Sequence, residues 1–348
     1  MTAPDDRAAT RPGSEPDPVD DPDPTLIPRP PSAGRRVAEA MAEEVGMAVD
    51  PSIQTSTAAD DGAREPDIGE PPGLPPERWL DLEGRGRTFA RVGEPGGGRP
   101  DVVLVHGWTV TADATFAPSY PALSSRYRVI APDLRGHGRG LPARRGLTLE
   151  TLADDLAATL DELAVRRAIV VGYSMGGAVA QLLWRRHPER VAGLVLCSTA
   201  QHFQGGPLSD LWYRGQGWVA PLIRAYPGPA RARMIQAVDG KVADGPYAAW
   251  FRRELLRSDP SALLRVGAAL GRFRSSSWIG EVDVPAAVVV TTRDHTVPTR
   301  RQRSLAAAVP GAAVYEVDGP HNSAVTRSDA WVPALRCALD EVVDRIDG

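Results

Sequence analysis

One serine in this chain lies in a pattern that could make it a nucleophile. Ser174 is the middle residue of the G-x-S-x-G pattern at 172–176, which directly follows the apolar run 168–171. A strand that passes into this pattern and then into a helix forms a sharp turn that exposes the serine hydroxyl above the sheet. The glycines lack a Cβ, so the two arms of the turn can approach closely. The residues therefore predict a nucleophilic serine.

A serine hydroxyl needs a base to take its proton and an acid to orient that base. In proteins with this turn, the acid and then the histidine follow the serine along the chain. Of the six histidines, His321 lies between the strand-like run 312–317 and the last expected helix, where the base is expected. His321 is therefore the predicted base. The other histidines lie before the turn, at the end of the helix behind it, or after earlier strands: His106, His137, His187, His202 and His295.

The acid has to be chosen from a larger set of carboxylates. Asp294 follows 286–290, a run rich in β-branched residues that is typical of a buried parallel strand. A carboxylate at the end of such a strand can meet His321 over the sheet edge. The competing position, the loop at 198–202, contains no carboxylate, and the next one along the chain is Asp210. Asp294 is the predicted acid.

Acyl chemistry at a serine also requires donors for the oxyanion. One is expected from the backbone N–H of Met175, the residue after the nucleophile, and the other from the loop after an earlier strand. The apolar run 101–105 is followed by a His-Gly pair and then by Trp108, whose backbone N–H is the second predicted donor. His106 of that pair is expected to pack and to form local hydrogen bonds.

In this combination the chain resembles the serine-nucleophile branch of the α/β-hydrolase fold superfamily. The resemblance covers about residues 77–348 and implies no cofactor and no metal. A serine nucleophile separates the chain from relatives of that fold that use aspartate, such as epoxide hydrolases and haloalkane dehalogenases. The segments that carry the resemblance are His106-Gly107, the expected structural turn 133–138, the elbow at 172–177, the run 188–191 and the Asp294/His321 pair.

The resemblance implies a serine hydrolase that cleaves an ester or a related acyl bond through an acyl-enzyme. Lipases, C–C hydrolases and lactonases share the same triad, so the fold alone does not separate these activities. The alternative is a cofactor-free haloperoxidase or perhydrolase with the same residues. A third hypothesis is a hydrolase-fold protein that binds a ligand without turnover. The expected substrate is a small to medium, largely apolar molecule.

The positions of these residues require strands that alternate with helices. Such alternation predicts an α/β fold, with a mainly parallel sheet covered by helices on both faces and an antiparallel pair at one edge. The expected strands are 79–83, 87–92, 101–105, 127–131, 168–172, 191–197, 286–292 and 312–317. The expected helices are 117–125, 149–163, 175–186, 298–308 and 329–346.

An insertion at 203–282 interrupts this alternation and is predicted to be a helical lid. It holds 10 of the 20 aromatic residues of the chain. Ligand sites are mostly apolar, so this enrichment favours an apolar pocket over the triad. The insertion contains no basic cluster that would indicate a phosphorylated or strongly acidic substrate.

Residues 1–76 differ in composition from the rest. They hold 15 of the 33 prolines, 16 acidic and 6 basic residues, and no Phe, Tyr or Trp. Low hydrophobicity with high proline content and net negative charge predicts a disordered tail. The predicted domain is therefore 77–348.

Composition excludes several other classes of protein. No apolar run is long enough for a membrane span, and the N-terminal residues lack a signal-peptide pattern, so a cytoplasmic enzyme is expected. The arginines are scattered, which argues against nucleic-acid binding. Cys197 and Cys337 both lie in patterns that suggest burial, and they predict no disulfide framework. A small-molecule acyl substrate is the expected partner, and the oligomeric state cannot be predicted.

Overall fold

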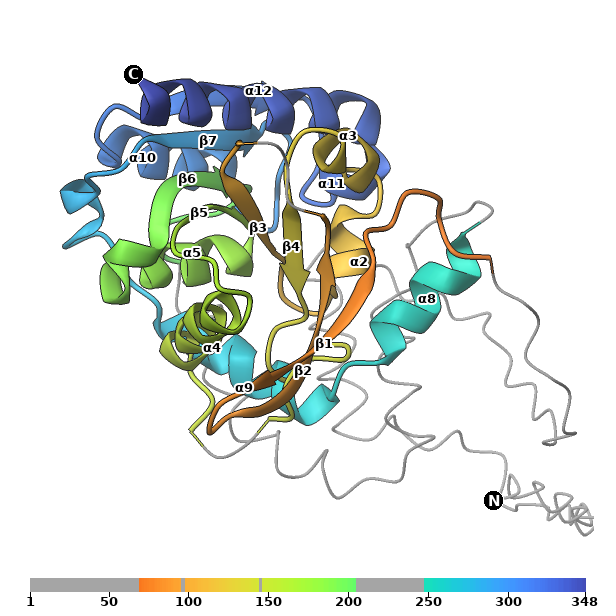
Figure 1. The fold of residues 1–348 in the computed structure, drawn as a ribbon. Coiled ribbons are helices and arrows are strands. Elements are labelled where there is room, and N and C mark those ends of the chain that lie inside the picture. The colour runs from red at the N-terminus through yellow and green to blue at the C-terminus, as the bar shows by residue number, and fades with distance from the viewer. Residues whose placement is uncertain (1–68, 95–97, 144–145, 205–246) are drawn as a thin grey trace, which may run out of the picture. The chain divides into compact units, whose positions relative to one another are not determined.

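The computed structural model describes residues 69–94, 98–143, 146–204 and 247–348. Within these ranges, eight strands form one sheet in the order β1-β2-β4-β3-β5-β6-β7-β8 (Figure 1). The strands are β1 (Glu77–Leu82), β2 (Gly86–Val92), β3 (Asp101–Val105), β4 (Val129–Pro132), β5 (Ala168–Tyr173), β6 (Val191–Cys197), β7 (Ala286–Thr291) and β8 (Ala313–Val317). β2 pairs antiparallel with β1 and β4, and the other neighbours are parallel. The predicted mainly parallel sheet with an antiparallel edge is confirmed.

The central strands consist of apolar, largely β-branched residues. Every residue of β5 and β7 is buried. Parallel strands that are covered on both faces have continuous apolar runs instead of alternating ones. This burial explains why the predicted strands 168–172 and 286–292 match the observed ones within a residue.

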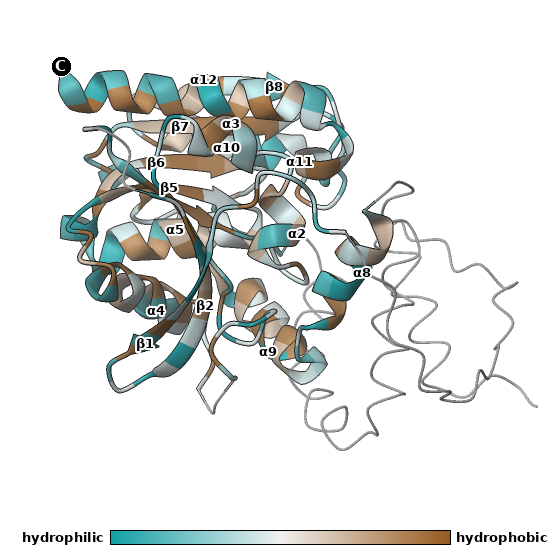
Figure 2. Ribbon diagram, turned by 45° about the vertical axis from the view of Figure 1, so that its right-hand side comes forward, coloured by the Kyte–Doolittle hydropathy of each residue, from teal (hydrophilic) through white to brown (hydrophobic). Residues whose placement is uncertain are grey.

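Helices cover both faces of the sheet (Figure 1). Alternate residues of β3 show the two faces, because Val103 and Val105 belong to one hydrophobic cluster while Val102 and Leu104 belong to the other. On the strands and helices, Figure 2 shows the apolar colour concentrated where these layers meet. The first cluster includes residues of α4 (Leu149–Glu162), α5 (Met175–Arg186), α9 (Pro260–Arg272) and α10 (Thr299–Ala308). The second includes residues of α2 (Ala112–Phe116), α3 (Tyr120–Ser124), α8 (Ala248–Leu256), α11 (Ser323–Thr326) and α12 (Ser328–Asp347). No helix in the described ranges has the length and apolar composition that crossing a membrane requires.

The short helix predicted near 117–125 is found as α3, but the helix before it, α2, was not predicted. Two short helices, α2 and α3, occupy 112–124 and meet at Ala117-Pro118-Ser119. Proline has no N–H to continue the helical hydrogen bonds. Pro118 thus separates the two helices, whereas Pro121 lies in the first turn of α3, where proline is tolerated.

The topology places the candidate site at one edge of the sheet. Parallel strands end at the same edge, and ligands of open α/β sheets bind outside those carboxyl ends. Trp108 follows β3, Ser174 follows β5, Asp294 follows β7 and His321 follows β8. Residues far apart in the sequence are therefore brought to one place by strand order alone.

The predicted lid insertion is described only in part. Residues 205–246 lie outside the described ranges, and with them Asp210 and four of the aromatic residues. The described part contains α8 and α9, and Trp250 of α8 and Phe273, directly after α9, are buried in the two hydrophobic clusters. These two aromatic side chains therefore hold the insertion against the sheet layers, and a ligand pocket beneath the insertion stays a prediction.

The segment just before β1 contacts the domain. Residues 1–68 of the predicted tail 1–76 lie outside the described residues, but 69–76 are described. The Val92 N–H donates to the Pro76 carbonyl at 2.9 Å, and Arg91 Nη1 donates to the Pro75 carbonyl at 3.2 Å. Contacts with the domain thus begin before the predicted boundary at 77.

These contacts lead to a prediction about truncation. A chain that starts at Gly69 should keep both its melting temperature and its kcat/KM, because it retains the bonds to Pro75 and Pro76. A chain that starts at Glu77 loses both acceptors, and its melting temperature should fall by several degrees, since about 1 kcal/mol shifts a domain of this size by a few degrees. Thermal unfolding and ester hydrolysis measure the two effects. A large loss in the longer chain would mean that residues 1–68 support the domain.

Candidate active site

Ser174 lies between β5 and α5 in a backbone conformation that few residues adopt. Its φ is 54° and its ψ is −119°, and a positive φ costs energy for a residue with a Cβ. Its N–H donates to the carbonyl of Cys197 at 2.9 Å, and its carbonyl accepts from the Thr199 hydroxyl at 2.7 Å. The end of β6 and the loop that follows it thus hold the strained turn in place, and strained turns of this kind are common at functional sites.

The two glycines of the G-x-S-x-G pattern are needed for close packing. A Cβ on Gly172 would lie 2.5 Å from the carbonyl oxygen of Gly176. A Cβ on Gly176 would meet the carbonyl oxygen of Val105 at the end of β3. Neither position therefore accepts a side chain without moving the backbone of the turn.

Ser174, His321 and Asp294 form one chain of hydrogen bonds. His321 Nε2 lies 2.9 Å from Ser174 Oγ, and His321 Nδ1 lies 2.6 Å from Asp294 Oδ2. The side chain of Asp294 is fully buried, while that of His321 is 20% exposed. Because a carboxylate can only accept, Nδ1 carries the proton and Nε2 is left to accept from the serine hydroxyl. The structure thus brings the three predicted residues together in the order that acyl transfer requires.

Tyr173 fixes the backbone of the histidine loop, a contact that sequence reasoning missed. Its hydroxyl donates to the His321 carbonyl at 2.5 Å, and the two rings lie 5.4 Å apart. Burial raises the pKa of the Tyr173 hydroxyl, so it remains a neutral donor. Tyr173 occupies a variable position of the pattern, and no signal in the sequence indicates this role.

Both predicted oxyanion donors belong to segments next to the serine. Met175 is the first residue of α5, where backbone N–H groups have no acceptor within the helix. Gly107 lies so close that a Cβ on it would be 3.4 Å from Ser174 Cβ. Trp108 follows directly, and its indole Nε1 donates to the Leu263 carbonyl on α9 at 2.8 Å. The structure therefore brings this loop beside the nucleophile, and the donor role of its N–H stays a prediction.

Comparison with known proteins assigns the chain to a family. The family model described as alpha/beta hydrolase fold matches residues 100–241. The pimeloyl-[acyl-carrier protein] methyl ester esterase of Aromatoleum aromaticum is 33% identical, over 63% of this chain and 90% of its own length. The chain belongs to the α/β-hydrolase family.

Two more matches indicate the range of activities in this family. The putative non-heme haloperoxidase of Mycobacterium phage D29 is 31% identical, over 73% of this chain and 92% of its own length. The enol-lactonase from Burkholderia xenovorans LB400, whose crystal structure is known, is 27% identical in sequence. The two structures match with a TM-score of 0.63, over 76% of this chain and all of the lactonase. All three relatives are named as enzymes, and this α/β-hydrolase is an enzyme too.

A buried histidine pair supports the loop after β3 of this α/β-hydrolase. His106 Nδ1–H donates to the Gly107 carbonyl at 2.8 Å, and its Nε2 accepts from the Leu134 N–H at 2.9 Å. Its ring packs edge-on against that of His137, with centroids 5.1 Å apart. Burial lowers the pKa of His106 to about 4. His106 is thus a neutral residue with local hydrogen bonds, as expected from the sequence.

His137 should make stability depend on pH with a defined sign. Burial lowers its pKa from 6.5 to about 3. Below about pH 6.5 the unfolded chain binds a proton here that the folded protein does not, so the free energy of unfolding falls on acidification through this window. In His137→Leu the free energy of unfolding should therefore fall less steeply on acidification, by about 1.4 kcal/mol for each pH unit. Urea unfolding of both proteins at pH 6.5, 5.5 and 4.5 measures the difference, and identical slopes would show that His137 does not contribute.

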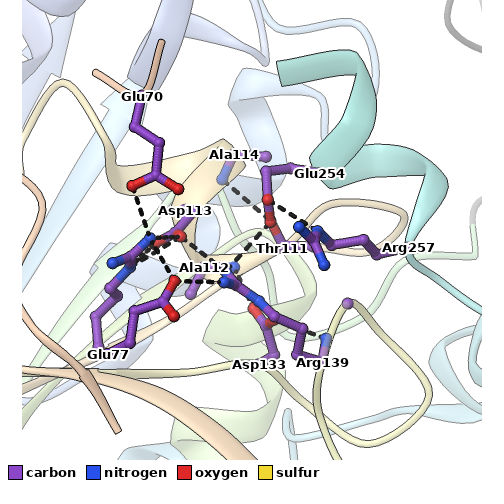
Figure 3. Close-up of polar contacts among 12 residues, drawn as sticks. Glu70, Glu77, Thr111, Ala112, Asp113, Ala114, Asp133, Arg139, Glu254 and Arg257 are labelled. Carbon is purple, nitrogen blue, oxygen red and sulfur yellow. Dashed lines mark hydrogen bonds and ion pairs between the residues drawn. The ribbon is translucent and has the colours of Figure 1, made fainter. Parts of the chain in front are cut away.

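A buried network of charges connects α8 to α2 (Figure 3). Arg139 Nη2 lies 2.8 Å from Asp113 on α2 and 3.2 Å from Glu254 on α8. Arg91 Nη2 lies 2.9 Å from the same Asp113 oxygen. Both carboxylates are buried, and burial raises the pKa of the Glu254 carboxyl. Removing one member of such a group leaves an unpaired buried charge and typically costs about 3–5 kcal/mol.

The same network holds the loop that carries Trp108. Asp133 accepts from the Ala112 N–H with Oδ1 and from the Arg139 N–H with Oδ2, both at 2.9 Å. The bond from the Trp108 indole to Leu263 connects that loop to α9. The segment that runs from β3 into α2 is therefore bonded directly to α9 and, through Arg139, to α8. These contacts agree with a structural role for the turn that begins at Asp133.

The described residues offer little other chemistry. In these ranges, no three or more His, Cys, Asp or Glu side chains are grouped so that they could hold a metal ion. Cys197 is buried, but Cys337 is exposed, so the prediction of burial is wrong for Cys337. It lies on the outward side of α12, whose inner face carries Leu335 and Leu339.

Proposed function

We propose that this α/β-hydrolase is a serine hydrolase that cleaves an ester or a related acyl bond through an acyl-enzyme intermediate. The observation that carries the proposal is the continuous set of hydrogen bonds from Ser174 through His321 to Asp294, at 2.9 and 2.6 Å. The named activity of the esterase relative supports the same class of bond. The aromatic content of the insertion supports a small to medium, largely apolar substrate.

In the first half of the reaction, Ser174 Oγ attacks the carbonyl carbon while His321 Nε2 takes its proton. The imidazolium that forms is stabilised by Asp294, which also keeps Nδ1 protonated. The carbonyl oxygen becomes an oxyanion and accepts from the N–H groups of Met175 and Trp108. Collapse of this intermediate breaks the bond to the alcohol, which leaves with the proton from Nε2.

In the second half, water replaces the alcohol. His321 Nε2 accepts a proton from the water as the water oxygen attacks the acyl carbon of the acyl-Ser174 ester. The second oxyanion uses the same two N–H donors. Its collapse releases the carboxylic acid, and the proton returns from Nε2 to Ser174 Oγ.

A p-nitrophenyl ester with a short acyl chain tests this sequence of steps. If deacylation is the slower half, rapid mixing should release a burst of p-nitrophenol close to one equivalent per protein. Intact-mass spectrometry of the quenched sample should show the mass of one acyl group, and digestion should place it on Ser174. Turnover with an acyl adduct on another residue would contradict the proposal, as would the absence of turnover across a panel of esters and lactones.

The haloperoxidase relative supports a second candidate activity, that of a perhydrolase. In that case hydrogen peroxide takes the place of water at the acyl-enzyme, and the product is a peracid that oxidises halide in solution. Acetate, peroxide and bromide should then brominate a dye in the presence of a chelator. Bromination that exceeds ester hydrolysis would favour this activity. The named activities of the relatives give no support to a non-catalytic ligand-binding role.

A further inference from the structure

The oxygen of Asp294 that faces His321 also accepts from two other side chains. His321 Nδ1 lies 2.6 Å from Asp294 Oδ2. The Thr291 hydroxyl donates to the same oxygen at 2.8 Å, and Gln302 Nε2 donates to it at 2.9 Å. Thr291 and Gln302 are both completely buried. Burying a hydroxyl and a carboxamide is unfavourable unless they form hydrogen bonds, so these donors are confined to this place.

The other oxygen of the carboxylate is held by the backbone. Asp294 Oδ1 accepts from the N–H of Thr296 at 2.9 Å and from that of Val297 at 2.8 Å. Because the carboxylate is planar, rotation about the Cβ–Cγ bond moves Oδ1 and Oδ2 together. The two side-chain donors therefore add a second set of bonds, at Oδ2, that opposes this rotation.

The carboxamide of Gln302 has only one orientation that satisfies its neighbours. Its Oε1 accepts from the Thr291 backbone N–H at 2.9 Å, and its Nε2 donates to the Val297 carbonyl at 2.7 Å. A flipped amide would point Nε2 at the Thr291 N–H, donor against donor, and Oε1 at the Val297 carbonyl, acceptor against acceptor. The second N–H of Nε2 is therefore directed at Asp294 Oδ2.

The Thr291 hydroxyl is placed by the end of β7. It lies 3.0 Å from Gln302 Nε2 and 3.2 Å from the Ser198 hydroxyl. Its single proton is best used toward the carboxylate, because hydrogen bonds to a charged acceptor are stronger. Its own oxygen is then left to accept from the Ser198 hydroxyl, because both N–H groups of Gln302 are already used.

We propose that Thr291 and Gln302 are positioning residues, which hold Oδ2 of Asp294 against Nδ1 of His321. The proposal rests on the proposed function, because it assigns His321 and Asp294 to catalysis. Without these donors only the two Oδ1 contacts oppose rotation of the carboxylate about Cβ–Cγ, so Oδ2 is held less well against Nδ1 and the proton on Nδ1 is less well fixed. The expected consequence is a slower chemical step with unchanged substrate binding.

Thr291→Val removes the hydroxyl and almost preserves the shape of the side chain, so it tests the role of the hydroxyl. We expect kcat to fall by about 10-fold to 100-fold, the size of effect produced by a small misplacement of catalytic groups, with KM within about two-fold of wild type. Thr291→Ser keeps the hydroxyl and should recover most of kcat. Thr292→Val is the matched control, since that hydroxyl is exposed and bonds to Asp318. It should behave as wild type.

Gln302→Glu provides a second variant at the other donor. Its carboxylate still accepts from the Thr291 N–H but presents oxygen instead of N–H to Asp294 and Val297. We expect a loss of kcat at least as large as that of Thr291→Val. Thermal unfolding of each variant identifies any that fail to fold, and Thr291→Val together with Thr291→Ser then carries the test.

A double-mutant cycle separates positioning from a structural role. If Thr291 acts through Asp294, Thr291→Val should have little further effect on kcat in an Asp294→Asn background. Equal effects in both backgrounds, or Thr291→Val with wild-type kcat, would overturn the inference. Labelling of Ser174 by a fluorophosphonate distinguishes a failure of the proposed function from a failure of this inference. An unreactive wild type would overturn the proposed function and this inference with it, whereas a reactive wild type with an equally reactive Thr291→Val would overturn this inference alone.

Discussion

Replacing Ser174 with alanine is expected to lower kcat by about 10⁴-fold to 10⁶-fold, because the attacking oxygen is removed while the rest of the site remains. Folding should be preserved. The turn is held through the backbone of Ser174, whose N–H donates to the Cys197 carbonyl and whose carbonyl accepts from the Thr199 hydroxyl, and not by the Ser174 hydroxyl. Alanine tolerates the positive φ no better than serine does, so the melting temperature should stay within a few degrees. Steady-state hydrolysis of a p-nitrophenyl ester measures the loss.

Labelling with a fluorophosphonate gives a readout that does not depend on knowing the substrate. Wild-type protein should be labelled at one site, and Ser174→Ala should not be labelled. Ser125→Ala is the matched control, because Ser125 is exposed and its hydroxyl bonds only locally, to the Ala122 carbonyl. That variant should label like wild type. Persistent labelling of Ser174→Ala would show that another residue is the nucleophile.

Much of the sheet could be predicted because its strands are buried on both faces. The continuous apolar runs at 168–172 and 286–290 have no polar residue to break them, and β5 and β7 are found there. The direction of the strands also predicts where the candidate site lies. Strands that run parallel end at one edge, so residues that follow β5, β7 and β8 are expected to approach one another. Ser174, Asp294 and His321 do so.

The contacts that hold these residues could not be predicted in this way. Glu254 and Arg139 are separated by 115 positions, and their ion pair has no counterpart in any local pattern. In the sequence, Gln302 is one polar residue of a helix that is rich in arginine. Its bond to Asp294 depends on how α10 packs against the end of β7, which the sequence does not indicate. Hydrophobic periodicity indicates which face of a helix is buried, but it does not indicate which polar group that face meets.

Replacing Asp294 with asparagine is expected to lower kcat by about 10⁴-fold through the wrong tautomer of His321. The Oδ1 position faces the N–H groups of Thr296 and Val297, so the amide oxygen of the asparagine must lie there. The amide NH₂ then takes the place of Oδ2 and presents a donor to His321 Nδ1. Nδ1 has to become the acceptor, and the proton moves to Nε2.

In that tautomer, Nε2 presents N–H to Ser174 and cannot take its proton. The same NH₂ also faces the Nε2 donor of Gln302, so a modest fall in melting temperature should accompany the loss of kcat. Asp294→Asn and Asp210→Asn, measured side by side, decide between the two candidate acids. Wild-type turnover in Asp294→Asn together with loss of turnover in Asp210→Asn would show that Asp210 supplies the carboxylate and that Asp294 only anchors the loop after β7.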